Sequence, residues 1–302
     1  METATTWTFA GCPAPGKPLD WAALNAFDWV KALKDVPQSP VYHAEGDVWI
    51  HTRMVMEALL DLPGYQALSE QRRHELFLAT LMHDIAKPLC TVIDPDGTIR
   101  SPRHALRGRN MSRLTSYSGE AGNIPPFQSR EHIAQLVRYH GLPLWFLEKE
   151  RSEVVVRRAS LVADMECLAL LAEADVRGRI CADQDELLDR VEMFREYCKE
   201  LGCWGQAAQF ENGLSRFSYF RNPENGIGYV PFDDLRGEVI LLSGLPGTGK
   251  DHWVAEHGAG RPVISLDEIR KELGISHKDT QGKVIQTAKA RAKAFLREGE
   301  PF

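Results

Sequence analysis

Apolar residues recur at intervals of three and four along most of the first two thirds of the chain. The pattern is strongest in DVWIHTRMVMEALLDL (47–62), QRRHELFLATLMHDIAKP (71–88), REHIAQLVRYHGLPLWFLEK (130–149) and MECLALLAEADVRGR (165–179). This spacing matches the 3.6-residue period of α-helices that each bury one face. The pattern therefore predicts an all-α domain over residues 20–220.

The helical pattern is interrupted most clearly between residues 90 and 104. There the turn signal DPDG (94–97) separates two short apolar pairs and predicts two short strands joined by a turn. Upstream of the domain, residues 1–19 contain GCPAPGKPL, which is too rich in Pro and Gly for a regular element. We expect this lead-in to run as irregular chain over the surface.

The pattern changes after residue 220. Residues 221–237 are rich in Gly, Pro, Asn and Asp, so we interpret them as a linker between two domains. Beyond it, EVILLS (238–243) and RPVISLD (261–267) are apolar runs typical of buried strands, and residues 279–299 have a helical pattern. The order strand, glycine loop, helix, strand, helix predicts a partial α/β domain over residues 238–302. The chain is thus expected to be a multidomain protein.

The bulk composition fits two folded domains. The 302 residues are 43% hydrophobic and 26% charged, and a net charge of 36 − 42 = −6 argues against nonspecific coating of nucleic acid. The six cysteines form no C-x-x-C pair, and the sequence shows neither a basic-apolar leader nor an apolar run of about 18 residues. We expect a cytoplasmic protein with reduced thiols and no membrane segment.

The first candidate site is GLPGTGKD (244–251), which follows a predicted strand and precedes a predicted helix. Glycines let backbone N–H groups turn inward around phosphate oxygens, and a lysine neutralises the terminal phosphates. Asp251 stands where Ser or Thr usually ligates Mg²⁺, which indicates either a damaged site or one in which a carboxylate holds the metal. The residues predicted to bind Mg²⁺ with ATP or another nucleoside triphosphate are Gly244, Gly247, Thr248, Gly249, Lys250 and Asp251.

A charged pair follows in SLDEIR (265–270), at the end of the second predicted strand. Asp267 can accept a proton from an attacking hydroxyl there, and Arg270 can hold the phosphate of an acceptor. The alternative is that Asp267 caps a helix and Arg270 lies on a solvated face. The loop and this pair resemble the 5′-hydroxyl polynucleotide kinases. The resemblance implies that Asp267 is the general base for an RNA 5′-OH and that Lys250 stabilises the transferred phosphoryl group.

The second candidate site is spread along the predicted helical domain. His83 and Asp84 are adjacent at the end of an apolar helix, and four further polar residues lie on or beside apolar helical patterns that would bury them near a common centre. Imidazoles and carboxylates suit Mn, Fe, Co, Ni or Zn, and adjacent ligands can bridge a metal pair. The predicted ligands are His51, His83, Asp84, His104, His140 and Asp175, with Asp164 as the rival to Asp175.

Three other histidines, His43, His74 and His132, lack a matching context, and we expect them at the surface or behind the ligands. Five arginines lie within the fourteen positions 100–113 around His104. They either guide a phosphodiester backbone to the metals or form a solvated charged face. Among them we assign Arg107 to substrate binding.

The ordered set His, His-Asp, His, His, Asp resembles the HD superfamily of metal-dependent phosphohydrolases over about residues 20–220. In that family the His-Asp pair lies at the metal centre, and the neighbouring lysine, here Lys87, faces the substrate phosphate. With the kinase-like segment included, the whole chain resembles the bacterial HD-Pnk RNA end-healing enzymes. The resemblance implies hydrolysis of 2′,3′-cyclic phosphate or 2′-phosphate RNA ends, with Asp84 and Lys87 in catalysis, and phosphorylation of 5′-OH ends. It also implies a functional link to an RNA ligase.

Two other functions stay open at this point: a small-nucleotide phosphohydrolase with a regulatory nucleotide-binding domain, and a C-terminal module that binds nucleotide without catalysis. The sequence leaves the metal, the nucleoside triphosphate, the phosphate isomer and the choice of RNA or DNA undecided. A P-loop kinase usually needs further βα units and an arginine-bearing lid, and neither is found after residue 299. We therefore expect a truncated kinase domain with little kinase activity.

Overall fold

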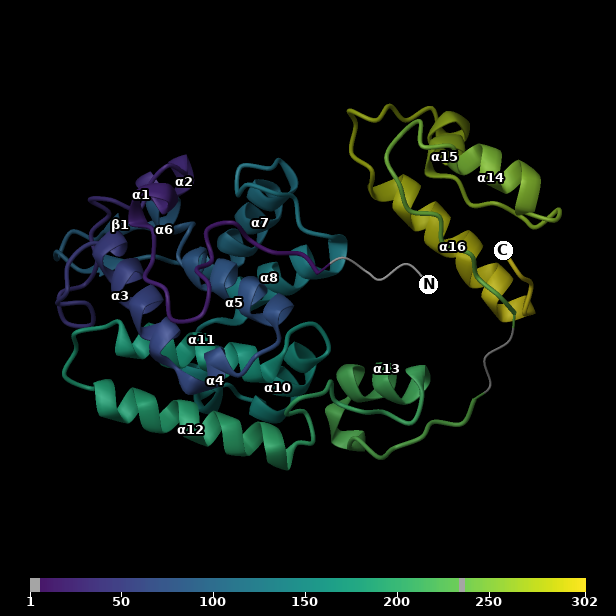
Figure 1. The fold of residues 1–302 in the computed structure, drawn as a ribbon. Coiled ribbons are helices and arrows are strands. Elements are labelled where there is room, and N and C mark those ends of the chain that lie inside the picture. Colours follow the sequence, from purple (N-terminus) through teal and green to yellow (C-terminus); the bar gives the residue numbers. More distant parts are fainter. Residues whose placement is uncertain (1–5, 234–236) are drawn as a thin grey trace. The chain divides into compact units, whose positions relative to one another are not determined.

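The computed structural model describes residues 6–233 and 237–302, which form two compact units, Met1–Tyr229 and Val230–Phe302 (Figure 1). The division falls inside residues 221–237, where the sequence predicts a linker. Residues 1–5 of the predicted lead-in and residues 234–236 of the predicted linker lie outside the described residues.

The first unit is built from α-helices, as the hydrophobic pattern predicts. Its longer helices are α3 (Val48–Asp61), α5 (Glu70–Leu81), α7 (His104–Tyr117), α8 (Phe127–Tyr139), α10 (Ser152–Ser160), α11 (Met165–Arg177), α12 (Gln184–Glu200) and α13 (Gly213–Arg221). Shorter turns connect them: α1 (Trp21–Leu24), α2 (Asp28–Lys31), α4 (Pro63–Gln66), α6 (Lys87–Cys90), α9 (Leu142–Trp145), and the 3₁₀ helices η1 (Phe146–Glu148) and η2 (Pro223–Asn225). In the part of the chain that the structure describes, no helix is long and apolar enough to cross a membrane.

Helix α11 lies at the centre of this unit. Asp164 begins the helix by accepting hydrogen bonds from the backbone N–H groups of Glu166 and Cys167. Most of its residues are buried, and it packs against α3, α5, α8 and α12 (Figure 1). A helix that is apolar around most of its circumference is stable only when other helices cover it. The surrounding helices therefore form a shell around α11.

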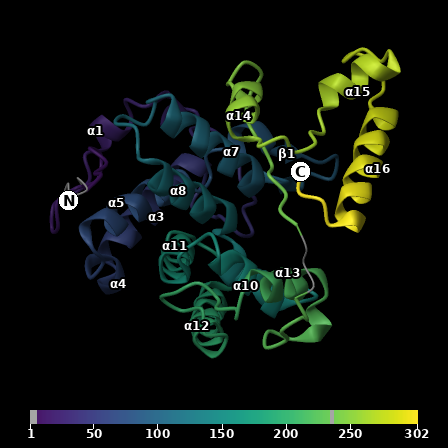
Figure 2. The same cartoon turned by 90° about the vertical axis from the view of Figure 1, so that its right-hand side faces the viewer.

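The remaining helices extend this shell. Helix α8 packs against both α5 and α7, and α12 packs against α11 and α9 (Figure 2). Asp47 begins α3 by accepting a hydrogen bond from the backbone N–H of Ile50, and the buried face of α3 includes Val48, Val55, Met56 and Leu59. The apolar spacing read from the sequence is thus the spacing that faces the core.

Helices α3 and α11 approach each other closely at Gly178, immediately after α11. A Cβ atom at this position would lie 2.6 Å from the backbone nitrogen of Val55 and 2.7 Å from its Cα. Both separations are far shorter than a carbon atom tolerates, so only glycine fits. The carboxyl end of α11 therefore meets the middle of α3.

The interruption between residues 90 and 104 contains the predicted pair of short strands. Strands β1 (Val92–Ile93) and β2 (Ile99–Arg100) are antiparallel, with Ile93 opposite Ile99. Gly97 in the connecting turn has a φ of +85°, a conformation that glycine adopts without strain. The hairpin that the turn signal predicts is confirmed.

The described part of the lead-in, residues 6–19, differs from the expectation in one respect. It contains no helix or strand, as predicted, but it does not only run over the surface, because Trp7 and Phe9 are buried in the helical core. The backbone N–H of Phe9 donates a hydrogen bond to His74 Nδ1 at 3.0 Å. Two large aromatic side chains gain more from burial than an irregular backbone loses by following the core.

The second unit contains three helices within its described residues: α14 (Lys250–His257), α15 (Leu266–Leu273) and α16 (Gly282–Glu298). The α/β sheet predicted here is not seen in those residues. Residues 238–240 instead exchange two backbone hydrogen bonds with Phe302, and residues 266 and 267 belong to α15. A buried parallel strand needs neighbours at both edges and cover on both faces. Leu241, at the centre of the first predicted strand, is 88% exposed.

Candidate metal centre

The structure brings all six predicted ligands together in the first unit. They come from α3 (His51), the turn after α5 (His83 and Asp84), the first residue of α7 (His104), the residue after α8 (His140) and the end of α11 (Asp175). All are buried except His104, which is partly exposed. Ends of several helices thus direct polar side chains into one place in an apolar core.

The six residues form two groups of three. His51, His83 and Asp175 make up the first group, and the ligand atoms of each group lie within 4.8 Å of one another. His51 Nε2 is 3.0 Å from Asp175 Oδ1, and the His51 and His83 rings have centroids 5.5 Å apart. The spacing of these three atoms could hold a metal ion.

The second group contains Asp84, His104 and His140. The Nε2 atoms of His104 and His140 are 3.2 Å apart. Asp84 links the two groups, because its Oδ1 is 3.5 Å from His104 Nε2 and its Oδ2 is 3.2 Å from His83 Nε2. A carboxylate in this position can bridge two metal ions.

The other ring nitrogens show which atoms are free to bind a metal. The Nδ1 atoms of His83, His104 and His140 lie 2.7, 2.8 and 2.8 Å from the backbone carbonyls of Thr80, Ser101 and Val137 respectively, three residues earlier in each case. A carbonyl only accepts, so each Nδ1 carries the proton and donates it. The three Nε2 atoms therefore present lone pairs, which is the usual arrangement of histidine metal ligands.

This proton assignment leaves lone pairs facing each other and buried polar atoms without a partner, and a bound cation would stabilise both. The Nε2 atoms of His104 and His140 face each other at 3.2 Å as two lone pairs. In addition, His83 Nε2 and Asp84 Oδ1 are buried and have no hydrogen-bond partner among the described residues. Buried polar atoms without a partner are costly. The residues present therefore fit a metal centre, and they fit it better than a purely hydrogen-bonded cluster.

The local charges favour the protonation states that metal binding needs. Burial acts to raise the pKa of Asp84, but the charges of Lys87 and His83 lower it well below its usual range. Asp175 is shifted in the same way, because the charge of Arg179 lowers its pKa against the effect of burial. Burial and the charges of His104 and His83 lower the pKa of His140 to about 3. At neutral pH both carboxylates are ionised and His140 is neutral, as ligands must be.

His83 shows the opposite shift. Burial lowers its pKa, but the charges of Asp84 and Asp175 raise it more, so the pKa of His83 lies above the ordinary value in the metal-free chain. The raised pKa favours a second proton, on His83 Nε2, in the metal-free chain, and a metal ion bound there would displace it.

The cluster opens into a cavity of about 540 Å³. Asp84, His104, His140 and Asp175 line it, so the centre can be reached from outside. Lys87, predicted to face a substrate phosphate, also lines the cavity, with Nζ 2.7 Å from Asp84 Oδ2 and 2.6 Å from Gln38 Oε1. The cavity therefore combines candidate metal ligands with a buried cation.

The predicted arginine cluster contributes less to the cavity than its number suggests. Arg100 lines the cavity and pairs with Asp94. Arg107, which we assigned to substrate, is not among the lining residues and donates to the Leu89 carbonyl at 3.1 Å. Arg113 pairs with Glu131. Arg107 therefore does not line the cavity, and its guanidinium group donates a hydrogen bond to a backbone carbonyl instead.

Several residues of the site were not found from the sequence. Arg179 is paired with Asp175 and lines the cavity, Gln38 contacts Lys87, and Glu45 contacts His51. None belongs to a motif, and Gln38 and Glu45 meet their partners through the fold. The sequence signal that could have found Arg179 is its position four residues after Asp175, on the same face of the end of α11.

The remaining histidines and the rival aspartate have structural partners. His74 accepts the Phe9 N–H, and His132 lies 2.6 Å from Glu75 Oε2. Asp164 begins α11 and pairs with Arg72, whereas Asp175 contacts His51. His43 is the exception among the three other histidines, because it lines the cavity. Of the two aspartates, the structure brings Asp175 to the cluster.

The predicted phosphate loop lies in the second unit and precedes α14. Gly247 and Gly249 have φ values of +78° and +82°, and Lys250 begins the helix with Asp251 in its first turn. Lys250 Nζ donates to the carbonyls of Gly244 and Leu245 at 2.9 and 2.8 Å. The lysine therefore closes over its own loop, at the position where the sequence predicts a phosphate.

Asp267 and Arg270 are brought together on α15, where they form an ion pair. Asp267 lies in the first turn and its side chain is 85% exposed, and the residue that caps the helix is Ser265, which accepts from the Glu268 N–H. Asp267 is therefore not the capping residue. Arg270 Nε also donates to Gln281 Oε1 at 2.8 Å.

Comparison with known proteins gives a limited result. No protein-family model matches the chain. The multifunctional CCA protein of Halorhodospira halophila (strain DSM 244 / SL1) is 32% identical over 111 residues, which are 37% of this chain and 23% of that protein. The chain thus spans about a quarter of the length of this relative, and the likeness is distant.

Proposed function

We propose that this chain heals RNA ends. In this proposal the first unit hydrolyses 2′,3′-cyclic phosphate or 2′-phosphate ends with divalent Mn, Ni, Co, Fe or Zn. Residues 244–270 use Mg²⁺ and ATP or another nucleoside triphosphate to phosphorylate 5′-OH ends. The observation that carries the first half is the pair of Nε2 atoms, from His104 and His140, that face each other at 3.2 Å beside a cavity of about 540 Å³.

The residues around the cluster have separable tasks in phosphoester hydrolysis. When bound, divalent metal ions supply Lewis-acid chemistry and activate water. Lys87 lines the cavity next to Asp84 and can neutralise a phosphoryl oxygen. Arg179 holds Asp175 through two guanidinium contacts and so keeps its carboxylate oriented. Charge stabilisation at the phosphate thus comes from side chains that the core already holds in place.

The outer part of the cavity supports an RNA end over a free phosphate ester. Tyr42 and Trp145 line it and are 57% and 37% exposed, and unpaired bases stack on aromatic rings. Arg138 and Lys149 also line it and form no ion pair within the described residues, so both can contact backbone phosphates. A base platform and two available cations are more than a lone phosphate requires.

The kinase half rests on the sequence motif and on the local order of the loop. Positive φ angles at Gly247 and Gly249, a lysine at the start of α14, and the Asp267–Arg270 pair support nucleotide binding and acceptor contact. The distant relative is named as multifunctional, which agrees with more than one activity in a related chain. A link to an RNA ligase follows from the products, because healed ends are ligase substrates.

The test is to incubate the chain with an RNA that carries a 2′,3′-cyclic phosphate and a 5′-OH, with ATP, Mg²⁺ and each transition metal in turn. We expect metal-dependent loss of the cyclic phosphate. Retention of the cyclic phosphate with every metal would overturn the first half of the proposal. Transfer of labelled γ-phosphate to the 5′-OH tests the second half independently.

The alternative function, a small-nucleotide phosphohydrolase with a regulatory nucleotide-binding unit, is favoured by the volume of the cavity, because about 540 Å³ is typical of small-molecule sites. A competition assay, in which free nucleotides and RNA ends are offered together and the hydrolysis of each is measured, distinguishes the two functions. Tyr42→Ala and Trp145→Ala should raise the KM for RNA ends while leaving that for an end with a terminal abasic ribose unchanged. Faster hydrolysis of free nucleotides than of RNA ends would favour the alternative.

A further inference from the structure

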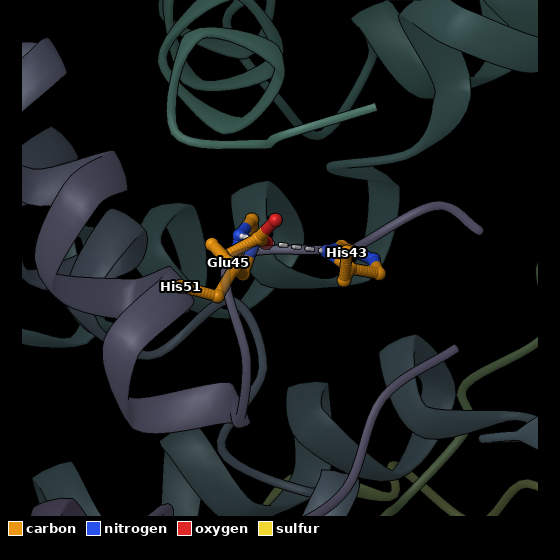
Figure 3. Close-up of side chains that lie close together, drawn as sticks. All are labelled: His43, Glu45 and His51. Carbon is orange, nitrogen blue, oxygen red and sulfur yellow. Dashed lines mark hydrogen bonds and ion pairs between the residues drawn. The ribbon is translucent and has the colours of Figure 1, made fainter. Parts of the chain in front are cut away.

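Glu45 lies in the loop before α3, and its carboxylate contacts two histidines (Figure 3). Its Oε1 is 2.8 Å from His43 Nδ1 and 2.8 Å from His51 Nδ1. Its Oε2 accepts the backbone N–H of Ile180 at 2.8 Å. The Glu45 side chain has no exposed surface. Both carboxylate oxygens are therefore used, in a place that water does not reach.

The His43 contact is a hydrogen bond. The His51 contact is an ion pair at close range, and the hydrogen bond of His51 Nδ1 goes to the Gly178 carbonyl. Neither contact needs a metal ion. His43, Glu45 and His51 also form a geometric group that could hold a cation. However, 2.8 Å is an ordinary distance for an N–H donor to a carboxylate, and each ring has a proton to give through Nδ1. The second oxygen is occupied by a backbone donor. All polar atoms at the contact are satisfied, in contrast to the Nε2 atoms of His104 and His140.

His51 needs such a partner for a structural reason. The other three candidate histidine ligands lie at or just beyond helix ends and donate Nδ1–H to the carbonyl three residues earlier. His51 lies inside α3, where the corresponding carbonyl, that of Val48, accepts from Thr52 Oγ1 at 2.8 Å. Its Nδ1 also has the Gly178 carbonyl at 3.3 Å, a longer contact. Two oxygen groups therefore face His51 Nδ1: the Gly178 carbonyl takes its hydrogen bond, and the Glu45 carboxylate is the closer contact and carries the charge that favours a proton on this nitrogen.

We propose that Glu45 is a positioning residue that holds the proton of His51 on Nδ1 and so directs Nε2 at the metal centre. The inference rests on the proposed metal-dependent function. With Nδ1 protonated, His51 Nε2 faces Asp175 Oδ1 at 3.0 Å as a lone pair opposite a carboxylate, a contact that a cation between them satisfies. A carboxylate behind a ligating histidine both fixes its orientation and increases its basicity.

The same carboxylate oxygen accepts a hydrogen bond from His43 Nδ1 and so orients the His43 ring at the cavity wall. His43 lines the cavity, and its ring lies edge-on to that of His51 with centroids 4.6 Å apart. Loss of Glu45 would therefore disturb a metal ligand and a residue of the substrate wall together. His43→Ala removes only the second effect, which makes it the matched control.

The first test is a titration of the metal-free full chain with Mn²⁺, without substrate. Glu45→Gln keeps the size of the side chain but removes the charge and one acceptor, so an amide NH2 must face either the Ile180 N–H or the two Nδ1 atoms. We expect Mn²⁺ affinity to fall about 10- to 100-fold, as is typical for partners behind metal ligands. His43→Ala should bind Mn²⁺ as the wild type does and change only KM. Wild-type Mn²⁺ affinity in Glu45→Gln would overturn the inference.

A second measurement uses the wild-type chain and does not depend on a variant folding. In the Zn²⁺-loaded protein, NMR should show a His51 Nδ1–H that exchanges slowly with water and has a cross-relaxation peak to the Glu45 γ-protons. A rapidly exchanging proton, or no such peak, would overturn the inference. Both readouts are independent of phosphoesterase activity, so they distinguish a wrong role for Glu45 from a wrong proposed function.

Discussion

The two candidate sites of this chain are built in opposite ways. In the first unit, five of the six candidate ligands are buried, and each is held by a helix or a helix end. In the second unit, the residues of the loop and the Asp267 side chain are mostly exposed. Among the described residues of 230–302, only Ile269 and Val284 are buried. One site is thus supported by a core, and the other has little packing behind it.

This difference shows what a motif does and does not determine. A cluster of ligands keeps its geometry when the side chains behind it cannot move, and close packing supplies that restraint. A glycine loop can form from local backbone preferences alone, but the groups that meet the phosphate still need fixed neighbours. The helical site is therefore preorganised by the fold, whereas the order of the loop is local.

The largest expected effect is on hydrolysis by the first unit. His83→Ala or Asp84→Ala should reduce phosphoesterase activity on the order of 10³-fold, because a catalytic metal supplies several kcal/mol of charge stabilisation. Asp251→Ala, in the second unit, is the control and should leave this activity unchanged. Rates measured with limiting Mn²⁺ on RNA with a 2′,3′-cyclic phosphate check the prediction. Full activity of either cluster variant would contradict it.

The next largest expected effect is on stability, which truncation of a buried leucine in the first unit should lower more than truncation of an exposed leucine in the second. Leu168 in α11 is completely buried, so Leu168→Ala should lower the free energy of unfolding by about 2–5 kcal/mol. Leu241 is exposed, and Leu241→Ala should change it by no more than about 0.5 kcal/mol. Urea unfolding followed by circular dichroism measures both. An equal loss of unfolding free energy in both variants would contradict the prediction and show that Leu241 is packed.

Acid should destabilise the metal-free first unit. The pKa of His140 is about 3 in the fold and about 6.5 when unfolded, so the unfolded chain binds more protons between these values. Stability should therefore fall as pH decreases through this window, by up to about 1.4 kcal/mol per pH unit from this group. The depressed carboxylates Asp84 and Asp175 add a loss below about pH 4. The raised pKa of His83 acts only above about pH 6.5, where its contribution is lost as pH rises.

The measurement is the unfolding free energy in chelator at several pH values. His140→Gln should flatten the slope between about pH 4 and 6.5. An unchanged slope would show that His140 is protonated in the fold.

The smallest expected effect is that of removing residues 230–302. The first unit contains all six candidate ligands and the cavity, so residues 1–229 alone should retain metal-dependent hydrolysis. A melting curve establishes that the shortened chain is folded, and the cyclic-phosphate assay then measures its activity. A folded but inactive fragment would show that the second unit contributes to the first site.

The sequence predicts the helical unit, and the proximity of the six candidate ligands within it, for a physical reason. Helical periodicity is a local signal, and a polar residue that interrupts its apolar face, as His51 does in α3, is carried into the core. Glu45 and Arg179 give no such signal. Glu45 receives the Ile180 N–H across 135 residues of sequence, and only the tertiary fold brings these groups together.

The predicted strands fail for the reverse reason. EVILLS is apolar and β-branched, which favours a strand locally, but a strand is completed by hydrogen bonds and packing from elsewhere. In the described residues, the backbone of 238–240 forms hydrogen bonds only with Phe302. The burial of Trp7 and Phe9 is a similar case. The Pro- and Gly-rich composition of the lead-in predicts irregular chain but does not show that two of its side chains pack into the core.

The close approach at Gly178 has a consequence for how this chain can vary. His51 and Asp175 belong to the two helices that touch there, so the gap between the helix axes sets the 3.0 Å between their ligand atoms. Even alanine at position 178 would push α3 and α11 apart and pull both ligands out of register at once. In a mutational scan, this residue should therefore be as intolerant as the ligands themselves, although it offers no side chain to the site. The absence of a side chain at position 178 thus sets the distance between the two helices and, with it, the distance between His51 and Asp175.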